Sequence, residues 1–294
     1  MKSISDRAEV SVDFPNKAYM GAFGRESSFE VKVEPDEVML RILRTGEERR
    51  EISVHLHYFL LADILAQLYK LRLAAVNTLV GAVDVAKGLA RIRDVETGAH
   101  LERMAAYSRL IAVALADGLD LSDEFIEYLY LFAPLHDIGK VGIPDRILLK
   151  PGKLDDEERR CMQQHVAVGV QLVRNIIGDL GIDNDLAATV MLNVVAHHHE
   201  RGDGSGYPQG LKMADIPIEA RIVAVADVYD AISSARPYKP AWSEAECVAE
   251  LRREAALKRL DPVCVEALIA AEPERTHIRQ QLSDACVPAI DHVA

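Results

Sequence analysis

The order of hydrophobic and polar residues divides the chain into a strand-like part and a longer helix-like part. Apolar and polar residues alternate in SFEVKVEP (28–35) and REISVHLH (50–57), as they do in half-buried strands. DEVMLRIL (36–43) is a weaker strand candidate. From Tyr58 the pattern becomes helical and contains no proline up to residue 94. We therefore expect strands only before residue 58.

Helical segments continue from about residue 75 to about residue 272. They are separated by loop signals such as GKVGIPDRILLKPGK, ERGDGSGYPQG and ARPYKPAWSE. The pattern predicts a mainly α protein. A helical bundle over residues 75–294, ending in a tail of about twenty residues, follows a small β-containing module over residues 1–74.

Composition restricts the classes of partner. The 294 residues are 49% hydrophobic and 27% charged, which suits a globular protein with a sizeable core. The formal net charge of −12 argues against a long nucleic acid as partner, because such binding needs a surface rich in Lys and Arg. A small anionic substrate is still compatible, since metals or a few cations make a single cleft positive.

Cysteine spacing and hydropathy predict a soluble cytoplasmic protein. Cys161, Cys247, Cys264 and Cys286 lie far apart, so we expect free thiols rather than disulfides or a thiolate zinc site. The first residues lack the apolar region of a signal peptide. The most apolar stretch, YFLLADILAQL, is too short to span a membrane.

Histidines and carboxylates accumulate in the helical part. Six of the ten histidines lie between residues 100 and 199. Glu96 and His100 are four residues apart, on one helix face, and His136 is followed directly by Asp137 near an expected helix end. His165 lies in a predicted helix. Three consecutive histidines, 197–199, fit no amphipathic pattern.

Each of these residues alone has an ordinary explanation. An isolated histidine is more often a surface or hydrogen-bonded residue than a ligand, and Glu96 with His100 would serve as a solvated pair. Asp227 is harder to explain in this way, because an acid on an Ala/Val-rich helix needs a buried partner. Together the residues favour a metal site. Imidazoles and carboxylates without thiolates suit Mn, Fe, Zn or Ni, and several carboxylates favour Mn or Fe.

Six motifs in order identify a resemblance. They are RDVETGAH, HDIGK, His165, HHERGDGSGYP, ADVYDAISSARPYKP and LDP at residues 260–262. With them the chain resembles the HD-GYP family, the bacterial branch of the HD-domain metal phosphohydrolases that hydrolyses cyclic di-GMP. The resemblance implies an HD-type helical bundle and a metal-dependent phosphodiesterase that produces pGpG, GMP or both.

The resemblance also implies the metal ligands. They are Glu96, His100, His136, Asp137, His165, His198, His199 and Asp227. His197 is then the spare histidine of the triplet. Members of the family with an acid at the position of Glu96 hold a third metal, so two or three divalent ions are expected, with Fe or Mn favoured.

Further positions match the family's substrate site. Lys140, Arg236 and Lys239 correspond to phosphate-binding residues, and Asp137 and Lys140 are the expected catalytic residues. Tyr207 either lies near the substrate or packs the loop onto the core. Asp230, three residues after Asp227, is expected to orient a metal ligand or Arg236.

The chain departs from the family pattern at Gly202, where a bulky aromatic residue is usual, so we expect a more mobile loop there. Residues 1–74 do not resemble a phosphoacceptor receiver, and they leave open a homodimer or a regulatory protein partner. Two alternatives remain for the function. One is a cyclic-dinucleotide receptor with little turnover, and the other is a phosphodiesterase for another substrate, such as a hybrid cyclic GMP-AMP or a mononucleotide.

Overall fold

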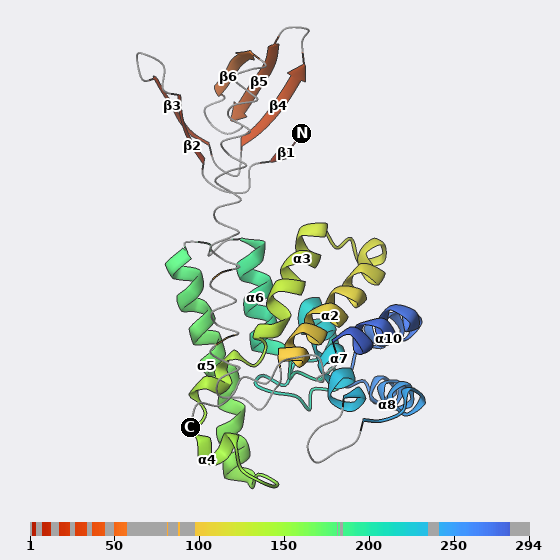
Figure 1. Ribbon diagram of the computed structural model, residues 1–294. Coiled ribbons are helices and arrows are strands. Elements are labelled where there is room, and N and C mark those ends of the chain that lie inside the picture. Colours follow the sequence, from red (N-terminus) through yellow and green to blue (C-terminus); the bar gives the residue numbers. More distant parts are fainter. Residues whose placement is uncertain are drawn as a thin grey trace. The chain divides into compact units, whose positions relative to one another are not determined.

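The computed structural model contains two compact units, residues 1–77 and 78–294, and each is considered by itself (Figure 1). It describes the backbone of strands between residues 2 and 57. It also describes residues 81, 88, 98–180, 182, 185–234 and 241–282. The predicted boundary between residues 74 and 75 lies outside this part of the chain.

The first unit contains the predicted strands. β4 (Ser27–Val33), β5 (Glu37–Arg44) and β6 (Arg50–His57) form an antiparallel sheet in the order β1-β4-β5-β6, with β1 at Lys2–Ser3. Leu40 lies opposite Val31 on one side and Val54 on the other. A second antiparallel pair, β2 (Ala8–Val12) and β3 (Ala18–Phe23), was not predicted from the sequence.

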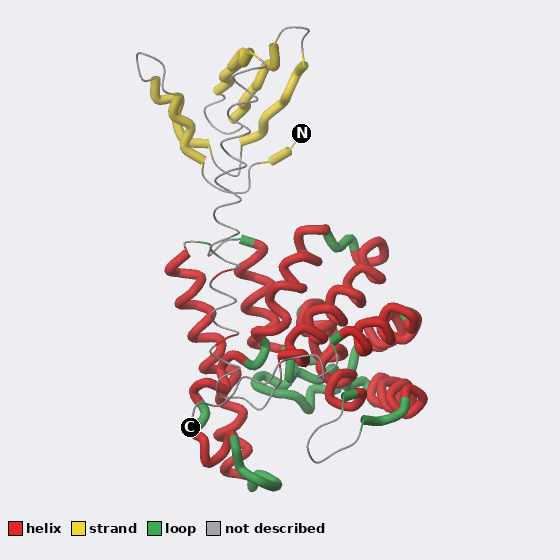
Figure 2. The backbone as a smooth tube through the Cα atoms, viewed as in Figure 1, coloured by secondary structure: helices red, strands yellow, loops and turns green. Residues whose placement is uncertain are grey.

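The second unit is helical, which confirms the predicted mainly α fold (Figure 2). Its α-helices are α2 (Gly98–Leu119), α3 (Asp123–Phe132), α4 (Asp145–Leu148), α5 (Asp156–Leu180), α6 (Leu186–His197), α7 (Ile218–Ser233), α8 (Glu244–Ala256), α9 (Pro262–Ala270) and α10 (Glu272–Gln281). Short 3₁₀ turns are η1 (Ala133–Leu135), η2 (Ile138–Gly142) and η3 (Met213–Asp215).

Local sequence explains where several helices begin. The side chain of Ser122 accepts a hydrogen bond from the backbone N–H of Phe125 and caps α3. Ser243 and Glu246 form a reciprocal capping box at α8. Asp261 of the LDP motif caps α9 and is followed by a proline, which is favourable at the first helical position.

The core surrounds α2 and α7, which pack against each other. Met104, Tyr107 and Ile111 of α2 are fully buried, as are Ile222 and Tyr229 of α7. α2 also packs against α3 and α9, while α5 packs against η2 and α6. These contacts bring the HDIGK, His165 and HHE segments to one region of the bundle.

Four other expectations have mixed outcomes. Cys161, Cys247 and Cys264 are free thiols, as predicted, and Cys286 lies outside the described residues. The predicted tail begins too early, because α10 continues to Gln281. Of the predicted helix over residues 58–94, the described Gly81 and Gly88 are helical. Within the described part, none of the helices is long and apolar enough to cross a membrane.

Candidate metal centre

The fold gathers seven of the predicted ligands into two adjacent groups. One group contains Asp137, His165, His198 and His199, and the other contains His100, His136 and Asp227. Within each group, one potential ligand atom per residue lies within 4.8 Å of all the others. Glu96 lies outside the described residues. His198 and His199 belong to the first group, and His197 belongs to neither.

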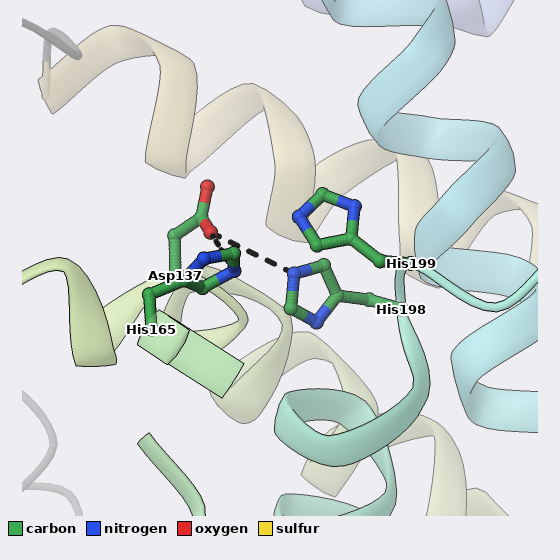
Figure 3. Close-up of side chains that lie close together, drawn as sticks. All are labelled: Asp137, His165, His198 and His199. Carbon is green, nitrogen blue, oxygen red and sulfur yellow. Dashed lines mark ion pairs between the residues drawn. The ribbon is translucent and has the colours of Figure 1, made fainter. Parts of the chain in front are cut away.

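Asp137 lies between the two groups, in the turn that joins η1 and η2. Its Oδ1 is 3.1 Å from His165 Nε2 and 3.6 Å from His198 Nε2 (Figure 3). Its Oδ2 is 3.2 Å from Nε2 of His136, a member of the other group. One carboxylate therefore presents a different oxygen to each group.

Main-chain carbonyls orient three of the imidazoles. The Nδ1 atoms of His136, His165 and His198 lie 2.9, 2.7 and 3.0 Å from the carbonyl oxygens of Ala133, Met162 and Val194. Because a carbonyl only accepts hydrogen bonds, each Nδ1 donates to it, and Nε2 is the ring nitrogen that is available to a metal.

The resulting arrangement suits a cation. The Nε2 atoms of His165 and His198 are buried without a hydrogen-bond partner in the described structure, and so is Asp137 Oδ1. These atoms face one another as lone-pair donors, which is unfavourable unless a cation lies between them. The residues therefore fit a divalent metal ion.

Electrostatics favour the deprotonated ligands that a metal needs. Burial lowers the pKa of both His198 and His199, so these imidazoles stay neutral. Burial opposes the charge on Asp137, but His136 and Lys140 hold the pKa of its carboxyl well below the usual range. The pair Lys140 Nζ–Asp137 Oδ2 is 2.9 Å apart, so the lysine borders the centre.

Two glycines allow the elements of the centre to approach. A Cβ on Gly139 would overlap the carbonyl oxygen of His165 and lie 2.5 Å from the backbone nitrogen of Gly169. A Cβ on Gly169 would lie 2.7 Å from Val195 Cγ1 of α6. The HDIGK motif therefore contains a glycine because η2 lies directly on the backbone of α5.

A buried ion-pair network adjoins the second group at His100. The His100 Nδ1 atom lies 2.7 Å from Asp230 Oδ2, so Asp230 contacts a predicted ligand from α7. Arg103, one turn after His100 on α2, donates to both oxygens of Asp230. Both His100 and Arg103 hold the pKa of Asp230 below its usual value, against the effect of burial. Arg103 was not identified from the sequence, although its spacing from His100 places it on the same helix face.

A family model described as HD domain matches residues 89–264, which include every described member of both groups. The chain belongs to the HD domain family. Its motifs, together with its relatives, place it in the HD-GYP branch.

Curated relatives of this HD-GYP chain include enzymes with two named specificities. It is 43% identical over 208 residues to a cyclic di-GMP phosphodiesterase of Vibrio cholerae, covering 69% of this chain and 42% of the relative. It is 44% identical over 193 residues to the cyclic di-GMP phosphodiesterase response regulator RpfG of Xanthomonas campestris, covering 66% and 48%. A 3'3'-cGAMP-specific phosphodiesterase 2 of V. cholerae is 40% identical over 193 residues, covering 65% and 34%. The chain thus spans about half the length, or less, of these relatives.

The GYP loop of the HD-GYP chain, residues 201–210, is closed by Glu200. This side chain is buried, and its Oε1 and Oε2 accept hydrogen bonds from the backbone N–H groups of Gln209 (2.7 Å) and Leu211 (2.9 Å). We did not assign a role to Glu200 from the sequence. The sequence signal that could have identified it is its position directly after the candidate ligands His198 and His199.

Tyr207 of the GYP loop lies against the metal centre. Its ring centroid is 4.6 Å from that of His199, and its backbone N–H donates to the carbonyl of His199. Burial raises the pKa of its phenol, so the hydroxyl stays protonated and able to donate. The side chain is half-buried, and this position is compatible with both roles expected for it.

Gly202 is tightly packed. It is buried, its N–H donates to the carbonyl of Arg259, and its carbonyl accepts from the N–H of Met213. A Cβ there would overlap the side chain of Met213 and lie 2.7 Å from the carbonyl oxygen of Lys258. These contacts argue against the mobile loop expected at Gly202, and its effect on activity stays a prediction. Arg236 and Lys239 lie outside the described residues.

Proposed function

We propose that this chain is a metal-dependent phosphodiesterase that hydrolyses cyclic di-GMP to the linear dinucleotide pGpG, to GMP, or to both in turn. The observation that carries the proposal is the position of Asp137, which offers one oxygen to each of two groups of histidines. The names of the cyclic di-GMP phosphodiesterases among its relatives supply the substrate.

The proposed ligands are His100, His136 and Asp227 on one side and His165, His198 and His199 on the other, bridged by Asp137. Bound divalent ions would lower the pKa of water to make a nucleophile and stabilise the charge that develops on the phosphate. Because the donors are nitrogen and oxygen without thiolate, we favour Fe or Mn. The lowered pKa values of Asp137, His198 and His199 favour the deprotonated forms that bind metal.

Positive side chains would orient the phosphodiester. Lys140 borders the centre, where its ammonium group would contact a phosphate oxygen bound beside Asp137. Arg236 and Lys239 are proposed as further phosphate contacts from the segment after α7. Tyr207, whose ring lies next to His199 and whose hydroxyl stays protonated, would donate to the substrate.

A hybrid cyclic GMP-AMP is the second candidate substrate. The cGAMP-specific relative is 40% identical to this chain, close to the 43% and 44% of the cyclic di-GMP phosphodiesterases. The same metal centre would serve both reactions, since they break the same type of bond.

Turnover under controlled metal loading tests the proposal. The full chain would be purified without oxygen, loaded with Mn or Fe, and incubated with cyclic di-GMP or 3'3'-cGAMP, with products separated by chromatography. We expect pGpG or GMP from cyclic di-GMP. Asp137→Asn should lose metal and turnover together, whereas Asp179→Asn, an exposed change on α5, should lose neither.

Two results would contradict this function. Tight binding of cyclic di-GMP by the metal-loaded chain without any linear product would indicate a receptor. Faster turnover of 3'3'-cGAMP than of cyclic di-GMP would assign the hybrid substrate.

The number of ions depends on Glu96 in our proposal. Glu96→Ala should remove one ion per chain and leave two, because the seven described ligands already form two groups. Elemental analysis of the wild type and the variant, loaded under the same conditions, measures the difference. Loss of all metal from the variant would show that Glu96 is integral to a single cluster.

Residues 1–74 are proposed to contact either a second copy of the chain or a regulatory protein. This role and the expected cytoplasmic location stay predictions from the sequence. Mass measurements of the full chain in solution, with and without cyclic di-GMP, test the homodimer.

A further inference from the structure

Arg103 occupies an unusual place for an arginine, because it is only 3% exposed and lies beside the metal centre. Its Nε and Nη2 atoms donate to the two carboxylate oxygens of Asp230. The remaining terminal nitrogen, Nη1, donates to the carbonyl oxygen of Leu282 at 2.8 Å, directly after α10. One guanidinium thus joins α2, α7 and the end of α10.

The carboxylate held by Arg103 also contacts His100. Asp230 is 1% exposed and its Oδ2 lies 2.7 Å from His100 Nδ1. The corresponding Nδ1 atoms of His136, His165 and His198 instead meet main-chain carbonyls three or four residues earlier in the chain. The orientation of those three rings is therefore local, whereas that of His100 depends on a side chain from another helix.

A carboxylate can rotate about its side-chain torsion, so a single contact with an imidazole does not fix it. The two parallel donors of a guanidinium fix both the position and the plane of the carboxylate. Removing a partner that orients a ligating histidine in this way commonly lowers the affinity for the metal.

We propose that Arg103 is a positioning residue for the metal group of His100, His136 and Asp227. It holds Asp230 in the plane that directs His100 Nε2 toward the metal, and it joins this network to the end of α10. The inference rests on the proposed metal centre. Beyond that function, it predicts that metal binding by one of the two groups depends on Arg103, a residue proposed to contact neither substrate nor metal.

Titration of the metal-free full chain with Co²⁺ tests the inference, because visible d–d bands report ligand geometry independently of turnover. In Arg103→Met we expect Co²⁺ affinity to fall about 10- to 100-fold at one site, with altered bands, while the other site keeps its affinity. In Arg103→Lys, which keeps the charge but loses the two-pronged contact, the same site should weaken by less.

Arg275 provides a matched control. It is also buried, at 1% exposure, and donates to a carboxylate, Glu244, and to a carbonyl, that of Leu268. Glu244 belongs to neither metal group. Arg275→Met should lower the thermal stability about as much as Arg103→Met but leave both Co²⁺ affinities and the visible spectrum unchanged.

Equal Co²⁺ binding by Arg103→Met and Arg275→Met, whether both are normal or both impaired, would overturn the inference. If Arg103→Met does not fold, wild-type affinities and spectrum in Arg103→Lys would overturn it, and selective weakening of one site would support it. A wild type that binds Co²⁺ in two sites but hydrolyses no cyclic dinucleotide would refute the proposed function alone. A wild type that binds no metal would refute both.

Discussion

At the scale of single residues, Asp137 and Glu200 show how different neighbouring groups give two carboxylates different roles. Each oxygen of Glu200 accepts a hydrogen bond from a backbone N–H, one from Gln209 inside the GYP loop and one from Leu211 directly after it. The oxygens of Asp137 instead face the imidazoles of His136, His165 and His198. Glu200 therefore stabilises the loop, and Asp137 is the one available to a metal.

Glu200→Gln should separate these roles. The amide would present an N–H₂ group to a backbone N–H, which leaves a buried donor unsatisfied at a cost of about 1–3 kcal/mol. We expect the KM for cyclic di-GMP to rise about tenfold or more while the bound metal per chain is unchanged. Glu274→Gln, at an exposed position of α10, is the control. Loss of metal with an unchanged KM would contradict this assignment.

At the scale of elements, the metal centre depends on how closely η2, α5 and α6 approach. Gly139 lies on the backbone of α5, and Gly169 of α5 lies against Val195 of α6. The distance between Asp137 and His165 therefore depends on the absence of a Cβ at Gly139 and Gly169 as much as on the ligands themselves.

Gly139→Ala should damage the centre through this packing. The added methyl group would collide with the carbonyl oxygen of His165, which costs about 1–3 kcal/mol or more because backbone must move. We expect a lower melting temperature and less bound metal. Gly178→Ala on α5 is the control, since a Cβ there meets nothing within 4 Å, and it should be neutral or slightly stabilising. Full metal content in Gly139→Ala would contradict the argument.

At the scale of the whole molecule, the hydrophobic core of the helical unit extends well beyond the metal centre. It includes Phe125 and Leu129 of α3, Leu251 of α8 and Leu268 of α9. This core does not need a metal to bury its apolar surface, unlike that of a zinc finger.

Removal of metal should therefore lower stability without unfolding the chain. An ion present at about 100 times its Kd contributes about 2.7 kcal/mol, or about 5–10 °C in the melting temperature of a domain of this size. Calorimetry and circular dichroism before and after chelation measure both quantities. Loss of helical signal on chelation at 25 °C would contradict this prediction.

The sequence predicted the parts of the fold and site that depend on local order along the chain. Helical periodicity located α5 and α7, and alternation located β4 and β6. The motifs singled out His165 and Asp227, which lie one in each of the two groups. Contacts between distant segments carried no such signal. Arg103 meets Asp230 across 127 positions, and Gly139 meets His165 only because η2 packs on α5. The β2–β3 pair was also missed: AEVSV of β2 does alternate apolar and polar residues, but it is short and its partner AYMGAF in β3 does not alternate.

The closure of the GYP loop by Glu200 has a consequence for how related enzymes diverge. The C-terminal end of the segment 201–210 is held through Gln209 and Leu211 by the side chain of Glu200, which directly precedes the segment and belongs to neither group of candidate ligands. Substitutions inside the segment would thus change what the loop presents to the proposed substrate while the candidate metal ligands keep their places. Selection could exchange one cyclic dinucleotide for another through a few loop positions, and relatives of both specificities would then retain similar overall identity to this chain.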